Sequence, residues 1–158
     1  MALNYLRVED ISSDLSFKQY AVDDMVRQVI RKYAKIFISK KIKMNFKPTG
    51  RYIVTDDKWF VFVLEQFISN ALKYTKKGQI SIYMKEKSLV IEDTGIGIPA
   101  EDLPRIFEKG FTGYNGRENK KSTGIGLYLC KNIMDKLQWN ITVDSEVGSG
   151  TKIYLTKM

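Results

Sequence analysis

The chain has 158 residues, of which 44% are hydrophobic and 28% charged, and its formal net charge is +8. This length and composition suit one globular domain with a real hydrophobic core. The chain contains no histidine and one cysteine, Cys130, which excludes an internal disulfide, a catalytic histidine dyad and a zinc site with histidine ligands.

The patterns along the chain predict helices among strands that are mostly linked as hairpins. Apolar residues at helical spacing indicate helices, and short alternating runs bounded by turn residues indicate strands. In chain order we expect a helix at 23–39, strands at 42–46 and 52–55, a helix at 57–74, strands at 79–85 and 88–92, a short helix near 100–107, a helix at 124–137, and strands at 140–145 and 151–156. This order favours an α+β fold, a two-layer sandwich whose mixed, mostly antiparallel sheet is covered on one face by helices.

Two boundaries follow from the same patterns. Residues 1–15 are polar and mixed, and we expect the end of an upstream helix and a linker there, with the domain itself at 16–158. Acidic pairs stand where the first two helices begin, so Asp23 or Asp24 is expected to cap the first helix, and Asp56 or Asp57 the second. The buried-helix spacing around Cys130 favours a core thiol over a reactive one.

The strand at 88–92 runs into a glycine-rich turn that starts with an acid, Asp93-Thr-Gly95-Ile-Gly97-Ile98. A carboxylate can accept a hydrogen bond from an exocyclic amine, and glycines let a ligand approach the backbone. An ordinary turn after a strand fits the same letters. On this motif alone both interpretations stay open.

A second glycine pair, in Thr123-Gly124-Ile-Gly126-Leu127, opens the helix expected at 124–137. Free backbone amides at the start of a helix bind phosphate, although a flexible junction would use the same glycines. The chain has no Gly-Lys-Ser/Thr, which excludes a P-loop, and neither glycine pair has the third glycine of a dinucleotide-binding fingerprint.

Polar side chains recur on one face of the helix at 57–74. Gln66, Asn70 and Lys73 are four and three residues apart, so they share that face. An asparagine oxygen can bind Mg²⁺ and a lysine can meet a phosphate, whereas a solvated helix face is the plainer alternative. The long connection at 99–123 carries Gly110, Gly113 and Gly116, with Arg117, Lys120 and Lys121 toward its end, and suits a lid.

Taken in this order, the motifs closely resemble the ATP-binding catalytic domain of sensor histidine kinases, in the GHKL ATPase superfamily. The resemblance runs from about Asp23 to the C-terminus. It rests on the boxes Asn70-Ala-Leu-Lys-Tyr-Thr75, Asp93-x-Gly-x-Gly97, Gly124-x-Gly126-Leu127 and Gly148-x-Gly150-Thr151, with Phe107 and Phe111 between them. It implies the Bergerat (GHKL) fold with a long ATP lid, and ATP and Mg²⁺ as cofactors.

The resemblance also implies roles for single residues. Asp93 is expected to accept a hydrogen bond from the adenine amine with Thr151 nearby, and Gly97 to keep the base edge unobstructed. Asn70 is the expected Mg²⁺ ligand, and Lys73 the expected phosphate contact. The remaining residues expected to bind the nucleotide are Tyr74, Gly95, Ile98, Phe107, Arg117, Thr123, Gly124, Gly126 and Leu127.

Position 66 departs from the family pattern. Many histidine kinases are expected to carry asparagine there and the hydrolytic relatives glutamate, but this chain has Gln66. An amide cannot act as a general base toward water. The residue therefore favours phosphoryl transfer over hydrolysis, and its own role, catalytic or structural, stays open.

The lid sequence 107–117 is similar to that of the bacitracin-type, intramembrane-sensing kinases of Gram-positive bacteria. This implies the cytoplasmic domain of a bacterial inner-membrane protein. Because the chain has no histidine, the γ-phosphate should go to a histidine on a separate dimerisation domain, for relay to a response regulator. The resemblance further implies an ABC transporter as a partner through the parent's membrane region, no nucleic acid, and a monomeric fragment.

Three alternatives share some of these features. A hydrolytic GHKL ATPase that drives conformational change would need the missing glutamate at position 66. A serine kinase of the anti-sigma type would share the fold but phosphorylate a serine protein. A nucleic-acid-binding module is suggested by the positive charge alone, and the basic residues are scattered without a binding motif.

Overall fold

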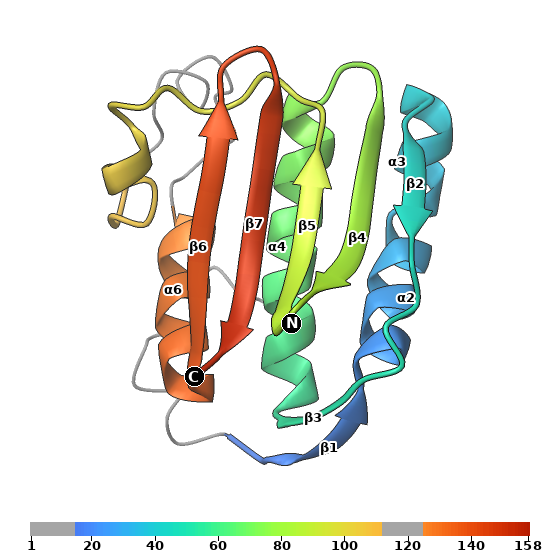
Figure 1. Ribbon diagram of the computed structural model, residues 1–158, viewed down its shortest axis with the longest axis vertical. Coiled ribbons are helices and arrows are strands. Elements are labelled where there is room, and N and C mark those ends of the chain that lie inside the picture. The colour runs from blue at the N-terminus through green and yellow to red at the C-terminus, as the bar shows by residue number, and fades with distance from the viewer. Residues whose placement is uncertain (1–14, 112–124) are drawn as a thin grey trace.

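The computed structural model describes residues 15–111 and 125–158, and its elements follow the predicted order closely (Figure 1). They are β1 (Lys18–Ala21), α2 (Val22–Lys32), α3 (Ala34–Lys40), β2 (Lys43–Phe46), β3 (Tyr52–Thr55), α4 (Asp57–Tyr74), β4 (Gln79–Lys85), β5 (Ser88–Asp93), the 3₁₀ turn η2 (Leu103–Arg105), α6 (Ile125–Leu137), β6 (Trp139–Glu146) and β7 (Gly150–Lys157). The expected linker at 1–15 lies outside the described residues except for its last residue.

Five strands form one mixed sheet in the order β2-β4-β5-β7-β6. Only β2 and β4 run parallel, and the other neighbours are antiparallel. Helices α2, α4 and α6 lie side by side on one face of this sheet, whereas no described helix covers the opposite face (Figure 1). The predicted two-layer α+β architecture is therefore confirmed.

Helix α4 is the centre of the helical layer and contacts α2 on one side and α6 on the other. Its side chains Phe60, Leu64 and Ile68 are fully buried, as the apolar face of the sequence predicted. Phe60 meets Trp139 of β6 edge to face, with ring centroids 5.3 Å apart. Because α4 is locked between sheet and helices, the polar residues on its remaining face are held in fixed positions.

Cys130 belongs to the same core, as its spacing predicted. Its side chain is fully buried on α6, and burial raises the pKa of the thiol. A thiol in this state is a poor nucleophile at neutral pH.

The helix predicted at 23–39 is in fact two helices. The backbone leaves helical geometry at Tyr33, between α2 and α3. Lys32 binds Glu65 of α4 at 2.6 Å, and Tyr33 is hydrogen-bonded to Ser69. These ties hold the chain against α4 while α3 turns to bury Phe37.

The predicted cap of the first helix was wrong. Helix α2 begins after Ala21, which offers no side-chain cap, because the unpredicted strand β1 leads directly into it. The Asp23 carboxylate instead accepts hydrogen bonds from Thr49 N at 2.8 Å, Thr49 Oγ1 at 2.7 Å and Gly50 N at 3.0 Å. Burial opposes ionisation of Asp23, but these bonds outweigh it and leave the pKa below its ordinary value.

The short helix predicted near 100–107 is reduced to the single 3₁₀ turn η2. Pro104 stands inside that turn and has no backbone N–H to continue a helical ladder. Among the described residues, no helix is both long enough and apolar enough to cross a lipid bilayer.

Asp56 is the cap of α4 that the sequence predicted, and its removal should destabilise the domain. The buried carboxylate accepts hydrogen bonds from Trp59 N at 3.2 Å and from Ser16 N at 2.8 Å. We expect Asp56→Ala to lower the free energy of unfolding by about 1–2 kcal/mol, measured by urea denaturation followed through tryptophan fluorescence. Asp56→Ser keeps a capping oxygen, so its free energy of unfolding should fall less than that of Asp56→Ala. Equal decreases in the two variants would argue against the cap.

Candidate functional site

Three polar side chains form a row across one end of the sheet. Asp93 of β5 lies opposite Thr151 of β7, which in turn lies opposite Ser145 of β6. Side chains alternate along a strand, and Leu89 and Ile91 of β5 belong to the helix-covered core. Asp93 therefore points to the same face as that core, and the row lies between the sheet and the helical layer.

The Asp93 carboxylate is largely enclosed but keeps acceptor capacity. Burial raises its pKa, and hydrogen bonds from the backbone of Gly95 and Thr151 offset part of that rise. The bond from Gly95 N to Oδ1 is 2.8 Å long. An ionised carboxylate has about four lone-pair sites, so this group can still receive an amine from a ligand.

The segment that follows β5 is tied to three other parts of the chain. Ile96 N donates to Tyr74 O at the end of α4 (3.1 Å), Gly148 N donates to Ile96 O (2.9 Å), and Ile98 N donates to Ser145 Oγ (2.8 Å). The end of α4, the turn between β6 and β7, and β6 itself thus converge on the glycine-rich turn.

The two glycines of this turn are required by close backbone approach. A Cβ at Gly95 would lie 2.6 Å from Tyr74 O. Gly97 has a φ of +78°, and a Cβ there would lie 2.1 Å from Glu146 O. The space that Gly97 leaves open therefore faces the protein's own backbone, and the predicted clearance for a base edge stays a prediction.

The polar row predicted on α4 reaches the start of α6. Gln66 lies against Gly126, since a Cβ at position 126 would be 2.5 Å from Gln66 Oε1. Farther along α4, burial lowers the pKa of the Lys73 ammonium, which lies 5.4 Å from the centroid of the Tyr74 ring. Among the described residues, the structure thus brings the α4 row together with Gly126 at one end and with the Asp93 turn at the other.

A buried hydroxyl adds to the polar groups here. Thr75 directly follows α4 and is fully buried, and its Oγ1 has no hydrogen-bond partner within the described part of the chain. It lies 2.9 Å from the position of a Cβ at Gly95. An unpaired buried hydroxyl beside the Asp93 turn is a group that a ligand or an ordered water would satisfy.

Not every predicted site residue can be located. Arg117, Thr123 and Gly124 lie outside the described residues. Phe107 and Leu127 are described, and both pack against the hydrophobic core. Of the connection at 99–123 that was predicted to form the lid, only residues 99–111 are described. In this part the Arg105 guanidinium lies 4.6 Å from the centroid of the Phe111 ring.

Ser145 is the residue at this site that sequence reasoning missed. It follows Ile141 and Val143 on the core-facing side of β6, so a hydroxyl stands where the pattern calls for an apolar side chain. Its oxygen contacts Ile98 N, Gly150 O and Thr151 Oγ1. In the sequence, this serine interrupts the alternation of apolar and polar residues along β6, and that interruption could have marked it as a site residue.

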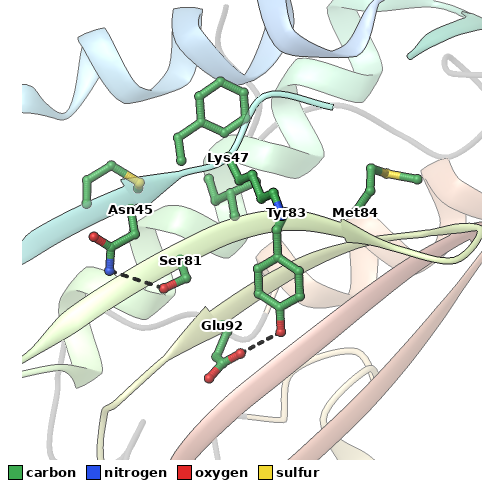
Figure 2. A pocket seen from close by; sticks show the side chains of 9 residues that line it. Asn45, Lys47, Ser81, Tyr83, Met84 and Glu92 are labelled. Atoms are coloured by element: carbon green, nitrogen blue, oxygen red, sulfur yellow. Dashed lines mark hydrogen bonds between the residues drawn. The ribbon is translucent and has the colours of Figure 1, made fainter. Parts of the chain in front are cut away.

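A separate hollow of about 660 Å³ lies at the β2 edge of the sheet (Figure 2). Tyr83 points toward Glu92 there and donates to its carboxylate at 2.6 Å, and burial together with this bond raises the pKa of Tyr83 to about 12. The lining residues are Met44, Asn45, Phe46, Lys47, Ser81, Ile82, Tyr83, Met84 and Glu92. None of them is a predicted site residue, so the hollow is distinct from the site around Asp93.

The site offers few groups for a metal ion. The described residues contain no cluster of three or more histidine, cysteine or acidic side chains. Asn70 is half-buried on the α4 row. A single amide oxygen fits Mg²⁺, which keeps several waters and is commonly held through substrate phosphates.

Comparisons with known proteins point to one family. The model of the family described as histidine kinase-, DNA gyrase B- and HSP90-like ATPase matches residues 55–157. The chain is 35% identical to sensor histidine kinase YxdK of Bacillus subtilis, covering 96% of this chain and 50% of that protein. It is 34% identical to sensor protein BceS of the same species (98% and 47% covered), and 37% identical to sensor protein kinase GraS of Staphylococcus aureus (94% and 44% covered). The chain thus spans about half the length of these relatives.

Solved structures agree with the fold. Full-length ShkA in complex with AMPPNP superposes with a TM-score of 0.75 at 20% identity, over 90% of this chain and 31% of that one. The catalytic domain of histidine kinase ThkA superposes with a TM-score of 0.73 at 19% identity, over 90% and 95% of the two chains. At these identities the likeness concerns the fold alone.

The clash at position 97 yields a prediction with a built-in control. Gly97 and Gly148 both have positive φ, but a Cβ at Gly148 would meet nothing within 4 Å. Gly148→Ala should lower the free energy of unfolding by about 1–2 kcal/mol, because alanine is strained in the left-handed backbone conformation. Gly97→Ala should lower the free energy of unfolding by about 1–3 kcal/mol more than Gly148→Ala does, because its methyl group overlaps Glu146 O. Thermal and urea unfolding of both variants measure the difference, and equal stability would contradict the close approach.

Proposed function

The chain belongs to the family of histidine kinase-, DNA gyrase B- and HSP90-like ATPases, and we propose that it is the ATP-binding catalytic domain of a two-component sensor histidine kinase. The observation that carries this proposal is the half-buried Asp93 carboxylate, whose glycine-rich turn meets the end of α4 within the part of the chain that matches the family. The identity of 34–37% to three sensor kinases, which include BceS and GraS, supports the intramembrane-sensing subfamily.

Base recognition is assigned to the row at the end of the sheet. Asp93 accepts a hydrogen bond from the adenine amine, with Thr151 beside it, and Tyr74 and Ile98 contact the nucleoside. The enclosed carboxylate supports this role, because a charge-assisted hydrogen bond is strong where water is excluded. Gly95 contributes indirectly, since its amide orients Asp93 Oδ1.

Phosphate binding is assigned to the α4 row and the start of α6. Lys73 meets a phosphate oxygen, and the amide of Gly126 at the first turn of α6 faces the phosphate tail. Asn70 would hold Mg²⁺, which would neutralise phosphate charge during transfer. Arg117, Thr123 and Gly124 complete the proposed set as sequence predictions outside the described residues, as does the closing part of the lid.

Gln66 is proposed as a positioning residue. Its amide packs against Gly126, which supports a role in holding the start of α6 against α4. An amide at this position does not remove a proton from water, so phosphoryl transfer is favoured over the hydrolysis carried out by relatives with a carboxylate.

The partners are proposals drawn from the family. The chain has no histidine, so the acceptor would be a histidine on the kinase's own dimerisation domain, and a response regulator would receive the phosphoryl group. The parent would be a membrane protein that places this domain in the cytoplasm and reaches an ABC transporter through its membrane region. The domain by itself is proposed to be monomeric and not to bind nucleic acid.

Loss of the Asp93 charge should weaken nucleotide binding without unfolding the domain. Asn in its place offers a donor in one of its two orientations and carries no charge. We expect Asp93→Asn to reduce ADP affinity by about 1.5–3 kcal/mol, or roughly 10- to 150-fold, by isothermal titration calorimetry. Asp144→Asn, an exposed position on β6, serves as the control. Unchanged affinity in Asp93→Asn would remove this residue from the site.

The same carboxylate predicts a pH dependence of ADP binding. Burial raises the pKa of Asp93 above its ordinary 3.8, and protonation replaces the acceptor with a donor. ADP affinity of the wild type should therefore begin to fall, as pH is lowered, at a higher pH than an ordinary carboxyl would give. The fall should be absent or much smaller in Asp93→Asn, and parallel curves for the two proteins would contradict the assignment.

The proposed reaction predicts that this chain binds ATP but does not label itself. Incubation with γ-labelled ATP and Mg²⁺ should leave no acid-labile phosphate on the chain, because it has no histidine. Addition of a histidine-bearing dimerisation domain from a similar kinase should yield label on that domain. Stable label on this chain, or rapid ATP hydrolysis without any partner, would favour a different member of the superfamily.

A further inference from the structure

Lysines without any acidic residue between them occupy two segments of the chain that meet at one edge of the domain. The segments are 34–47, which holds α3 and β2, and 75–79, which leads from α4 into β4. Because the net charge of the whole chain is +8, these segments carry most of its excess positive charge. Their lysines, which together with Ile38 we call the lysine face, are Lys35, Lys40, Lys41, Lys43, Lys47, Lys76 and Lys77.

Backbone contacts bring the two segments together. Lys43 N donates to Gly78 O at 3.1 Å, and Lys43 lies opposite Gln79 where β2 runs parallel to β4. Lys41 N donates to Ile38 O at 3.1 Å, at the point where the chain leaves α3 for β2. Figure 1 shows α3 and β2 together at the edge of the domain that lies away from β6 and α6. The lysine face is therefore one region of the surface.

The positive charges of this region are not balanced by the protein. Among the described residues, the nearby Lys32 pairs with Glu65 at 2.6 Å, whereas no lysine of the lysine face forms an ion pair. Lys40 is half-buried and its ammonium donates to Leu72 O near the end of α4, and the other lysines of the face are exposed. Like charges that lie close together repel one another, and a negatively charged partner would relieve this repulsion.

Aliphatic side chains stand exposed among these cations. Ile38 is 77% exposed, the largest exposure of any large hydrophobic residue in the described part of the chain, and Ile36 is 43% exposed. Phe37 between them is buried and joins the hydrophobic core, so α3 is held in place without the two isoleucines. Lysines around an exposed aliphatic side chain are typical of surfaces that lie in the headgroup region of an anionic membrane.

We propose that the lysine face binds the anionic surface of a lipid bilayer, with its lysines against the headgroups and Ile38 at the boundary of the acyl chains. The proposal goes beyond nucleotide binding and phosphoryl transfer. It rests on the proposed function in one respect only, because a parent protein in the membrane would keep this domain near such a surface.

The residue types favour a bilayer over an acidic macromolecule. All the cations of the face are lysines, whose compact charge suits a diffuse anionic surface, whereas recognition of individual phosphates or carboxylates favours the arginine fork. A single-stranded nucleic acid would also need exposed aromatic rings on which its bases stack. The aromatic residues of the two segments are Phe37, which is buried, and Phe46, which is half-buried beneath the Arg27 guanidinium.

The test is co-sedimentation of the whole chain with phospholipid vesicles. The chain should bind vesicles that contain about 30% phosphatidylglycerol in phosphatidylcholine, and it should not bind vesicles of phosphatidylcholine alone. Raising the NaCl concentration from about 50 mM to about 300 mM should weaken binding by about tenfold or more, because salt screens exposed charges.

Two pairs of substitutions make the same change in charge at opposite ends of β4. Lys43→Gln with Lys77→Gln removes two exposed cations from the lysine face and should weaken binding to the anionic vesicles by about 5- to 30-fold. Lys85→Gln with Lys87→Gln removes two exposed cations where β4 turns into β5, and should weaken it by less than about twofold.

A second comparison tests the apolar contact. Ile38→Ser leaves the charge unchanged and should weaken vesicle binding by about three- to tenfold, because the isoleucine no longer leaves water on binding. Val54→Ser replaces a 50% exposed side chain on β3, outside the lysine face, and should bind as the wild type does. Far-UV circular dichroism confirms that each variant is folded.

The outcomes separate this proposal from its alternatives and from the proposed function. Absence of binding to the anionic vesicles, or equal weakening in the two lysine pairs, would overturn it. Tighter binding to duplex DNA or polyglutamate than to the vesicles, with no effect of Ile38→Ser on vesicle binding, would overturn it in favour of an acidic macromolecule. A wild type that binds the vesicles but shows no ADP binding by calorimetry would overturn the proposed function alone.

Discussion

The candidate site depends on one backbone contact, the hydrogen bond from Ile96 N to Tyr74 O. It joins the turn after β5 to the last residue of α4, which are the two segments that carry the acidic and the amide-bearing motifs. The approach leaves no room for a side chain at Gly95. The apolar face of α4 fixes the helix against the sheet, and the glycine at position 95 lets the turn approach the end of that helix. Both features are needed for the two polar segments to meet at the edge of the hydrophobic core.

What the sequence could predict was local. Helix α4 was bounded correctly because Asp56 caps it within one turn and its apolar face repeats over 18 residues. What the sequence could not predict depends on distant partners. Strand β1 has four residues and exists by pairing with β3, more than thirty positions away. Asp23 resembles a helix cap in the sequence, yet it closes the turn at Thr49 and Gly50.

In the candidate site, too, some residues can be recognised from local sequence and others only from contacts between distant segments. The glycines, Asp93 and the α4 row stand in motifs that can be read from consecutive residues. Ser145 has no motif, and its importance comes from atoms at positions 98, 150 and 151 that only the fold brings around one oxygen. Polar residues at core-facing strand positions near a glycine-rich turn are therefore worth marking before a structure is known.

On the sheet face opposite the helices, the described residues form no second helical layer, and side chains of the sheet itself exclude water there. Val90 of β5 is fully buried, although it alternates with Leu89 and Ile91 and so points away from the helices. Its cross-strand neighbours are Tyr83 on β4 and Tyr154 on β7, and two large amphipathic rings can exclude water from the small side chain between them. Within the part of the chain that the structure describes, the centre of the sheet is thus shielded from water on this side by side chains of the sheet itself. A substitution that shortens either ring would expose Val90, so these two tyrosines contribute to the core although they lie outside the helical layer.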